Sequence, residues 1–566
     1  MSKKIITSAL PYPHGRLHLG RVVGAYLPAD IYARWSRAMG DDVIFISGTD
    51  DHGVGIEMEA DKLGRTYSQV VTHYRDMYRE NFRSLGIEFD LFDGTDTPEH
   101  EIISHDFFHR IYEQGLLIEK ASEQMYCEIC AKFLPDRYIT GTCPKCGAEW
   151  QNGDQCEKCG SMLTPEELIN PTCKTCKGIN LVMKPTKHLQ FQLQMLQWDV
   201  AAWLETKRTT WRDNVVSTAL DKWIKDDLHP RDYTRDVKCG ISVPLAWYED
   251  KTIYVWFEAP LGYISITDRY LKQVGSRWVL QDWRQNPQTE LIHFIGKDNT
   301  VFHSISRPSQ IIAYNKISDQ KYILPTQIPA NEFLNLEGKK FSTSRGYAIW
   351  AEDITRDYDP EFVRYYLTMI IPETSDSNFY WKEFQDNCNN LTDVVWNLVS
   401  RLTTLLVKYN DGIMLPISDI SLSETDQALI DQVLITRDNI ITSMWQFRIR
   451  ESLGASIDLF RAINKYLNDT TPWTVAKTHV TAATQIVSVA CHALICAAQL
   501  LAPFLPNTSK KILSIFAIWG STYQQIDPRL TVVQWPIVPL EWYLFTKITD
   551  EQIQWEVDKL QKILSQ

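Results

Sequence analysis

Hydrophobic residues near the N-terminus follow a pattern that predicts a strand, a loop, a helix and a second strand. Residues 4–9 and 43–46 are short apolar runs typical of buried strands, and residues 19–39 repeat apolar positions at helical spacing up to Gly40. The loop before the helix, residues 13–21, reads PHGRLHLGR and concentrates two histidines and two arginines. We therefore predict an α/β unit whose helix begins among positively charged side chains.

The last third of the chain, from about Gln385, shows helical periodicity throughout. Its most apolar stretch, residues 486–501, contains Ser488, His492 and Gln499. A membrane-spanning helix needs about 20 predominantly apolar residues. We therefore predict that this segment is a buried core helix, and that an all-helical region follows the α/β region.

Length and composition are typical of a large protein with several domains. With 566 residues, 44% of them hydrophobic, the chain is long enough for roughly three to four domains. No signal peptide is visible, because the first four residues lead directly into a strand, so we expect a cytoplasmic protein with no membrane partner. The net charge of −12 argues against general coating of nucleic acid but allows one basic RNA-binding face.

Eight of the 12 cysteines form four CxxC pairs, which are Cys127/Cys130, Cys143/Cys146, Cys156/Cys159 and Cys173/Cys176. Two such turns complete a tetrahedral metal site, so the spacing predicts two structural Zn²⁺ sites with four cysteines each. Disulfides or redox chemistry are the weaker alternative in a cytosolic protein. Sequential pairing of the turns and nested pairing, in which the outer turns close around the inner ones, both satisfy this geometry. The other cysteines, Cys239, Cys388, Cys491 and Cys496, are expected to be ordinary buried thiols.

Several sequence blocks occur together in a specific order. They are ALPY (9–12), HLGR (18–21), FISGTDDHG (45–53), the cysteine-rich insertion, TRD (234–236), YVWFEAP (254–260), IHFIGKDN (292–299) and KFSTS (340–344). Over nearly its whole length the chain resembles methionyl-tRNA synthetases, which are class I aminoacyl-tRNA synthetases, with HLGR at the HIGH signature and KFSTS at the KMSKS signature. The KFSTS form and the four CxxC turns resemble the archaeal-like branch. We favour nested pairing, with residues 143, 146, 156 and 159 in one site and 127, 130, 173 and 176 in the other.

The resemblance implies an enzyme that joins the carboxylate of an amino acid to the α-phosphate of ATP, with Mg²⁺, and expels pyrophosphate. Most of that work is positioning and charge stabilisation, and a helix N-terminus such as the one at residues 18–20 favours phosphate. The residues that the resemblance assigns to ATP are His18, Gly20, Gly296, Asp298, Lys339, Lys340 and Ser342. It implies His18, Arg21 and Lys340 as catalytic residues.

The resemblance also implies a methionine pocket, in which Asp50 would bind the α-amino group with Arg235 as its ionic partner. The side chain would meet an apolar and aromatic surface suited to a thioether, formed by Leu10, Tyr12, Trp256, Ala259, Pro260, Tyr263 and His303. In the helical region, Asn397, Arg401 and Trp473 would bind the tRNA anticodon through hydrogen bonds and base stacking.

These blocks imply an α/β protein in which a Rossmann nucleotide-binding domain is split by an insertion and followed by a helical bundle. The expected segments are 1–117 and 231–325 (the two Rossmann halves), 118–230 (the connective insertion with the zinc knuckles), 326–384 (the stem-contact region with the KFSTS loop) and 385–566 (the anticodon-binding domain). No further dimerising module follows Gln566, so we expect a monomer whose partners are tRNA(Met), methionine and ATP.

Three positions depart from the family pattern. Arg21 replaces the second histidine of HIGH, and a guanidinium is longer, forked and permanently charged. Thr343 replaces the second lysine of KMSKS, and Arg307 falls where the family usually has a Trp or Phe beside the methionine side chain. A buried guanidinium is costly unless it is paired. Arg307 must therefore turn outward, find a carboxylate, or belong to a pocket for a different amino acid, such as an acidic one.

Three functions remain open at this point. The primary one is a methionine–tRNA ligase. The second is a methionyl-tRNA-synthetase-like enzyme that activates another amino acid for tRNA-independent biosynthesis; Asn397, Arg401 and Trp473 speak against it. The third is a non-catalytic RNA-binding paralogue, which is disfavoured by the presence of His18, Gly20, Asp50, Asp298 and Lys340.

Overall fold

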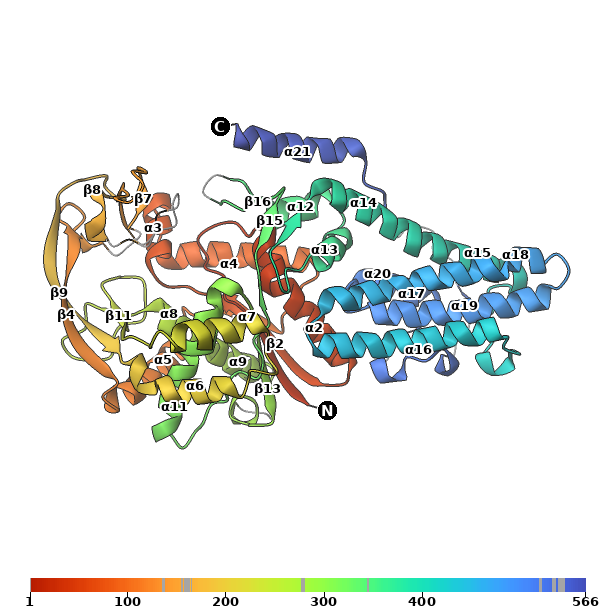
Figure 1. Cartoon of the computed structure of the whole chain (residues 1–566), viewed down its shortest axis with the longest axis horizontal. Helices are drawn as coiled ribbons and strands as arrows, with labels where there is room; N and C mark the ends of the chain where they lie inside the picture. Colours follow the sequence, from red (N-terminus) through yellow and green to blue (C-terminus); the bar gives the residue numbers. More distant parts are fainter. Residues whose placement is uncertain are drawn as a thin grey trace.

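The computed structural model is elongated, with the cysteine-rich insertion at one end and a helical bundle at the other (Figure 1). It describes residues 2–134, 138–153, 156, 163, 165–275, 280–343, 346–518, 522–531, 536–537 and 545–565. The N-terminal α/β region lies in the middle of the molecule, so both the cysteine-rich insertion and the helical bundle extend from it.

Five parallel strands form the central sheet, in the order β14-β13-β1-β2-β3. They are β1 (Lys3–Ser8), β2 (Asp42–Thr49), β3 (Leu91–Gly94), β13 (Thr289–Gly296) and β14 (Ala330–Asn331). The two predicted apolar runs are β1 and β2, and Ile6 of β1 pairs with Phe45 on one side and Ile292 on the other. The strand order reverses between β1 and β13, and in parallel α/β sheets ligands bind at the carboxyl ends of the strands at such a point.

The helix predicted at residues 19–39 runs from Leu19 to Ala38 in three pieces. These are α1 (Leu19–Arg21), a π-helical turn η1 (Val22–Tyr26) and α2 (Leu27–Ala38); we call the whole the signature helix. It ends before Gly40, whose φ of 87° favours glycine because the residue has no Cβ. The π-helical turn was not predicted, and such turns are frequent at functional sites.

Helices cover both faces of the central sheet. Ile5, Ile44 and Ile46 pack on the α9 side, whereas Ile6 and Phe45 face the signature helix. The longer covering helices are α3 (Val54–Leu63), α4 (Tyr67–Ser84), α5 (Pro98–Glu113), α9 (Gly262–Gln273) and α11 (Arg307–Ile317). Shorter turns are α8 (Val255–Glu258), η6 (Ala259–Leu261), α10 (Leu280–Arg284), η7 (Lys297–Asn299) and the π-helical turn η8 (Phe302–Ser306).

A long two-stranded arm carries the cysteine turns away from the sheet (Figure 1). Its strands β4 (Leu117–Cys127) and β9 (Leu181–Phe191) pair antiparallel along their full length, with β5 (Lys132–Phe133) and β10 (Arg231–Asp232) at the sides. At the tip lies a small sheet of β6 (Ile139–Thr142), β7 (Gln151–Asn152) and β8 (Ile169–Cys173). The chain returns through α6 (Gln197–Glu205), α7 (Asp213–Val216), the π-helical turn η5 (Ser217–Ile224), β11 (Thr234–Arg235) and β12 (Thr252–Ile253).

A three-stranded sheet, in the order β16-β15-β17, presents the KFSTS segment. Its strands are β15 (Leu334–Leu336), β16 (Lys339–Lys340) and β17 (Ser377–Phe379), and α12 (Ala351–Asp357) and α13 (Pro360–Met369) lie between the last two. The bundle consists of α14 (Trp381–Leu391), η9 (Thr392–Trp396, π-helical), α15 (Asn397–Asn410), α16 (Glu424–Trp445), α17 (Ile449–Thr470), α18 (Pro472–Val475), α19 (Val480–Leu501) and α20 (Pro506–Ile515), with α21 (Asp550–Leu564) outside it.

Helix α19 contains the predicted apolar segment and forms the centre of the bundle. Among the described helices it is the one whose length and apolar character would suit a membrane span, but 72% of its apolar window is buried inside the molecule. It packs against α15, α16, α17 and α20. The predicted core helix is therefore present at this position.

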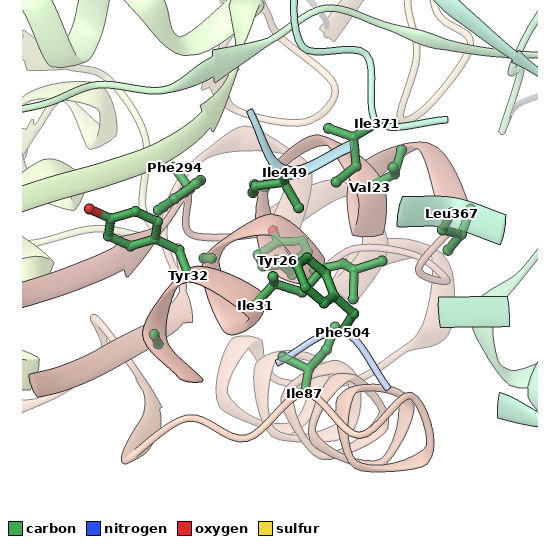
Figure 2. Packing of buried hydrophobic residues seen from close by; sticks show 14 of the residues in the cluster. Val23, Tyr26, Ile31, Tyr32, Ile87, Phe294, Leu367, Ile371, Ile449 and Phe504 are labelled. Atoms are coloured by element: carbon green, nitrogen blue, oxygen red, sulfur yellow. The ribbon is translucent and has the colours of Figure 1, made fainter. Parts of the chain in front are cut away.

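A buried apolar cluster joins the signature helix to the helical region (Figure 2). Val23, Tyr26 and Ile31 of the signature helix meet residues from later parts of the chain, which are Leu367, Ile371, Ile449 and Phe504. At the edge of this cluster lies the buried side chain of Arg364. It pairs with Asp30 at 2.8 Å and donates to the carbonyls of Leu85 and Phe504, both at 3.0 Å.

Candidate active site

A cavity of about 1010 Å³ opens where β1 and β13 end. Its walls are formed by the loop before the signature helix and the start of that helix, the segment after β13 and the KFSTS segment. The lining includes eleven residues predicted from the sequence, which are Leu10, Tyr12, His18, Gly20, Arg21, Asp50, Arg235, Trp256, Gly296, Asp298 and Lys340. These residues come from distant parts of the chain, so the fold assembles them into one site.

The two signature segments meet at His18 and Phe341. The imidazole of His18 stacks on the Phe341 ring, with centroids 5.2 Å apart and an angle of 23° between the planes. The N–H of Leu19 also donates to the carbonyl of Ile349 at 3.0 Å. A Cβ on Gly20 would lie 3.0 Å from His18 Nδ1 and 3.7 Å from the Phe341 ring, so glycine keeps this corner open.

His18 is a neutral side chain at the start of the signature helix. Burial, and then the charge of Arg21, lower its pKa to about 3. Its Nδ1 atom is buried and has no hydrogen-bond partner among the described residues. A neutral imidazole offers one N–H and one lone pair. At a helix N-terminus, where backbone N–H groups are free, this arrangement suits a phosphate or another anionic group.

Asp50 is an acidic side chain on the cavity wall. Its Oδ1 atom is buried without a hydrogen-bond partner among the described residues, and burial followed by the charges of Glu258 and Asp51 raises its pKa well above the ordinary value. An incoming ammonium group would relieve this cost by pairing with the carboxylate. Arg235 also lines the cavity and forms an ion pair with Asp232 at 2.7 Å.

Tyr12 lines the cavity and packs against the start of α3. Its hydroxyl accepts a hydrogen bond from the N–H of Gly55 at 3.1 Å. A Cβ at Gly55 would lie 2.4 Å from the Tyr12 ring, and Gly53 has a φ of 98°. Both positions therefore require glycine, which explains the two glycines that follow Asp50.

Four of the predicted amino-acid-binding residues lie behind the cavity wall instead of lining it. They are Ala259, Pro260, Tyr263 and His303. The Tyr263 hydroxyl and His303 Nε2 are 2.9 Å apart, and His303 Nδ1 donates to the carbonyl of Asn299 at 2.9 Å. Because Nδ1 carries the proton, Nε2 accepts from the Tyr263 hydroxyl. Trp256, by contrast, is 47% exposed and lies at the cavity mouth.

Arg307 is buried, with 1% of its surface exposed. Its Nε donates to the carbonyl of Pro260 and its Nη1 to Nε2 of His293, both at 3.1 Å. No carboxylate of the described residues pairs with it, and burial lowers its pKa to about 10. Of the three outcomes expected for this residue, the structure therefore excludes an outward orientation and provides no acidic partner in its described part.

The cysteine turns assemble into two groups at the far end of the arm. Cys127, Cys130, Cys173 and Cys176 form one group, with Sγ–Sγ distances of 3.6 Å (127 to 176) and 3.8 Å (130 to 173). Tetrahedral Zn²⁺ with ligands at 2.3 Å requires sulfurs roughly 3.8 Å apart. The second group contains Cys143, Cys146 and Cys156, with 3.6 Å between the last two sulfurs. The predicted fourth ligand, Cys159, lies outside the described residues.

Comparison with known proteins identifies the family. A model described as tRNA synthetases class I (M) matches residues 4–403, and a model of the anticodon binding domain of methionyl tRNA ligase matches residues 418–561. The chain belongs to the methionyl-tRNA synthetase family. The methionine–tRNA ligase of Cytophaga hutchinsonii is 40% identical over 99% of this chain and 81% of its own length. That of Pyrococcus horikoshii is 40% identical over 98% of this chain and 76% of its own length.

The fold is also that of a methionyl-tRNA synthetase. The crystal structure of the Mycobacterium tuberculosis methionyl-tRNA synthetase bound by methionyl-adenylate superposes with a TM-score of 0.79 at 19% identity. The match covers 96% of this chain and 100% of the other. The predicted α/β class with a helical C-terminal domain is therefore confirmed.

The remaining signature residues take different positions relative to the cavity. Lys340 and Thr343 line it, whereas Lys339 and Ser342 do not. Both lysines are exposed on β16, and the Ser342 N–H donates to the carbonyl of Tyr347 at 2.9 Å. Ser344 lies outside the described residues. Exposed lysines on a short hairpin are free to move towards a bound anion.

The three residues assigned to the anticodon lie in the bundle, away from the cavity. The guanidinium of Arg401 is 5.3 Å from the centre of the Trp473 ring, and Trp473 remains 38% exposed. Asn397 is exposed on the same helix as Arg401 and follows the π-helical turn η9. The Asn397 amide donates to Asp393 at 3.4 Å. The structure thus places an Arg–Trp pair and an exposed amide in the bundle, with Asn397 and Arg401 four residues apart on one helix face.

Sequence reasoning missed several side chains that shape the site. Phe341 was recognised as part of KFSTS, but not as the ring that stacks on His18. His293 and Arg284, which pack behind Tyr263, were also missed. His293 belongs to the IHFIGKDN block, and its polar ring inside an apolar strand was the available signal. Arg284 belongs to no sequence motif, so only the tertiary fold shows that it lies beside this site.

Proposed function

We propose that this protein is a methionine–tRNA ligase of the cytoplasm. It activates methionine with ATP to form methionyl-adenylate and transfers the methionyl group to the 3′ end of tRNA(Met). The observation that carries this proposal is the single cavity that brings the HLGR and KFSTS segments together beside Asp50. The near-complete match to methionine–tRNA ligases supports the choice of amino acid and of acceptor.

In this proposal the signature helix binds the ATP phosphates. His18 and the backbone at Gly20 hold the α-phosphate, Arg21 and Lys340 stabilise its charge as pyrophosphate leaves, and Mg²⁺ accompanies the nucleotide. Gly296 and Asp298 bind the ribose. Lys339 and Ser342 approach when the hairpin closes over the phosphates.

Methionine binds with its α-amino group on Asp50 and its side chain towards Leu10, Tyr12 and Trp256. The unpartnered carboxylate oxygen of Asp50 supports this orientation. Access to Ala259, Pro260, Tyr263 and His303 requires the side chains at the cavity wall to move. Charge-assisted contacts at Asp50 fix the reacting carboxylate near the α-phosphate, which is the positioning that activation requires.

The arm has a structural role in this proposal. Two Zn²⁺ ions, one per cysteine group, hold the tip sheet, with Cys159 completing the group of Cys143, Cys146 and Cys156. Four-cysteine sites have no open coordination position, so they supply rigidity and take no part in the reaction. Asn397, Arg401 and Trp473 recognise the anticodon by hydrogen bonding and stacking.

One experiment tests the two half-reactions separately. We expect methionine-dependent ATP–pyrophosphate exchange and charging of tRNA(Met), both reduced at least 100-fold in His18→Ala. Trp473→Ala should leave exchange unchanged and reduce charging about 10- to 100-fold, because base stacking on an aromatic ring is lost. Absence of exchange with methionine contradicts the proposal. Exchange without charging favours the alternative, an enzyme that activates an amino acid for tRNA-independent biosynthesis.

A further inference from the structure

Two guanidinium groups are buried together behind Tyr263. Arg284 and Arg307 are each 1% exposed, and burial followed by the charge of Arg307 lowers the pKa of Arg284. Within the described part of the chain, neither has a carboxylate within ion-pair distance. Buried charges in proteins are normally paired with an opposite charge. This pair is therefore an unusual concentration of positive charge.

The histidines around these arginines do not compensate the charge. Arg307 donates to Nε2 of His293, so the proton of that ring lies on Nδ1 and faces the Thr7 hydroxyl at 2.5 Å. Burial, followed by the charge of Arg307, keeps the pKa of His293 well below its ordinary value, and that of His303 is about 4. Both rings are neutral at pH 7, and the guanidinium of Arg307, with a pKa of about 10, stays charged.

Arg284 also has unused donors. Its Nη2 donates to the carbonyl of Tyr263 at 2.7 Å and to the Thr267 hydroxyl at 3.1 Å. Its Nε and Nη1 atoms are buried without a partner among the described residues. A buried donor without an acceptor is costly, so an added acceptor group near Arg284 would stabilise this buried arginine.

The arginines contact the residues assigned to the amino-acid pocket. Arg307 donates to the carbonyl of Pro260, and its guanidinium carbon is 5.8 Å from the centre of the Tyr263 ring. Leu10 packs against the cluster that contains Tyr263 and also lines the cavity. The π-helical turn η8 directly precedes Arg307 and contains His303. We call Arg284 and Arg307 together the cationic wall. It thus forms the far end of the pocket, separated from the cavity by Leu10.

We infer that Arg307 is a specificity-determining residue that makes the pocket accept amino acids of about the length of methionine whose side chains end in an oxygen acceptor. A thioether is a weak acceptor, whereas a sulfoxide or carboxylate oxygen can take a charge-assisted hydrogen bond from the guanidinium. Such amino acids therefore compete with methionine for activation. This inference rests on the proposed function, because the amino acid must first bind through its α-amino group at Asp50.

The test compares ATP–pyrophosphate exchange with L-methionine, L-methionine sulfoxide, L-glutamate and L-norleucine. Norleucine is the matched apolar control, since it has the length of methionine and no acceptor. The quantity of interest is kcat/KM for the better oxygen-bearing amino acid divided by kcat/KM for norleucine. Arg307→Met should lower this ratio about 10- to 100-fold, the usual effect of losing a charge-assisted hydrogen bond. A fall of less than 10-fold overturns the inference.

Control variants show whether a lower ratio comes from the change at Arg307 or from general damage to the protein. Arg269→Gln changes an arginine on the same helix as Tyr263 that pairs with Asp93 at 2.9 Å, and it should leave the ratio unchanged. If Arg307→Met does not fold, Arg307→Gln replaces it. That variant keeps a polar side chain but removes the charge, and the same 10-fold criterion applies.

Binding to the wild-type protein distinguishes failure of this inference from failure of the proposed function. Ligand binding to the folded state raises Tm. A larger rise in Tm with methionine sulfoxide or glutamate than with norleucine supports the inference even if no exchange is found, in which case only the proposed function fails. Exchange with methionine, combined with an equal or larger rise with norleucine, leaves the proposed function intact and overturns the inference.

Discussion

Three histidines beside the active site, His18, His293 and His303, are neutral for the same physical reason. Each loses water on folding, and each faces an arginine or a donor that opposes a second proton. His303 has its proton on Nδ1 and accepts from Tyr263.

This neutrality predicts acid sensitivity. The pKa of His303 is about 4 in the folded protein and 6.5 as the ordinary value, so between these values the unfolded chain binds a proton that the folded chain does not. Stability therefore falls as the pH drops through this window, by about 2 kcal/mol from His303 between pH 7 and pH 5. His303→Gln keeps an acceptor for Tyr263 and cannot titrate, so calorimetry should show a smaller drop in Tm over this range than in the wild type. The exposed His73→Gln is the control, and equal drops in the wild type and His303→Gln contradict the prediction.

At the scale of single elements, the sequence allowed the periodic features to be predicted and not the irregular ones. Strand β1 and the signature helix were expected within one residue at each end, because apolar spacing reports burial directly, whereas β2 continues three residues beyond the predicted run, to Thr49. The π-helical turns at Val22–Tyr26 and Phe302–Ser306 were not, since one extra residue in a turn leaves the apolar pattern almost unchanged. The second of these turns precedes Arg307, so the inward direction of that side chain could not be predicted either.

The cysteine groups give a prediction that separates the two pairings of the turns. We expect two zinc ions per chain by elemental analysis. Under nested pairing, Cys127→Ser combined with Cys173→Ser disrupts one site and leaves one zinc ion, whereas under sequential pairing it disrupts both. Cys127→Ser combined with Cys143→Ser has the opposite outcomes, namely no zinc when the pairing is nested and one when it is sequential. Cys388→Ala, at a buried thiol outside both groups, should retain both ions.

On the scale of the whole molecule, one buried arginine joins three segments. Arg364 bonds Asp30 of the signature helix, the carbonyl of Leu85 after α4 and the carbonyl of Phe504 after α19. The apolar cluster in Figure 2 lies around the same joint. The helix that begins at the proposed ATP site is thereby fixed to the bundle that carries Arg401 and Trp473.

Arg364→Met should destabilise the protein by about 3–5 kcal/mol, because it leaves Asp30 buried with one partner fewer and removes a donor from the carbonyls of Leu85, Gly86, Pro503 and Phe504. The matched control is Arg356→Met on α12, an exposed arginine paired with Asp353 and Asp357, whose loss should change the stability little because exposed ion pairs are screened by solvent. Urea denaturation measures both changes. Similar midpoints for the two variants contradict the role assigned to Arg364.

The position of β1 also affects how the protein is made on the ribosome. The first strand of the chain is the middle strand of the sheet, and Thr7 bonds to His293, 286 residues further along. At 5–20 residues per second, β1 waits roughly 15–60 s for this neighbour to be synthesised. During that time the arm, whose strands β4 and β9 pair with each other, can already fold. Newly made chains therefore pass through a long stage in which an apolar strand lacks one of its neighbours, and chaperones that bind such segments have their main opportunity then.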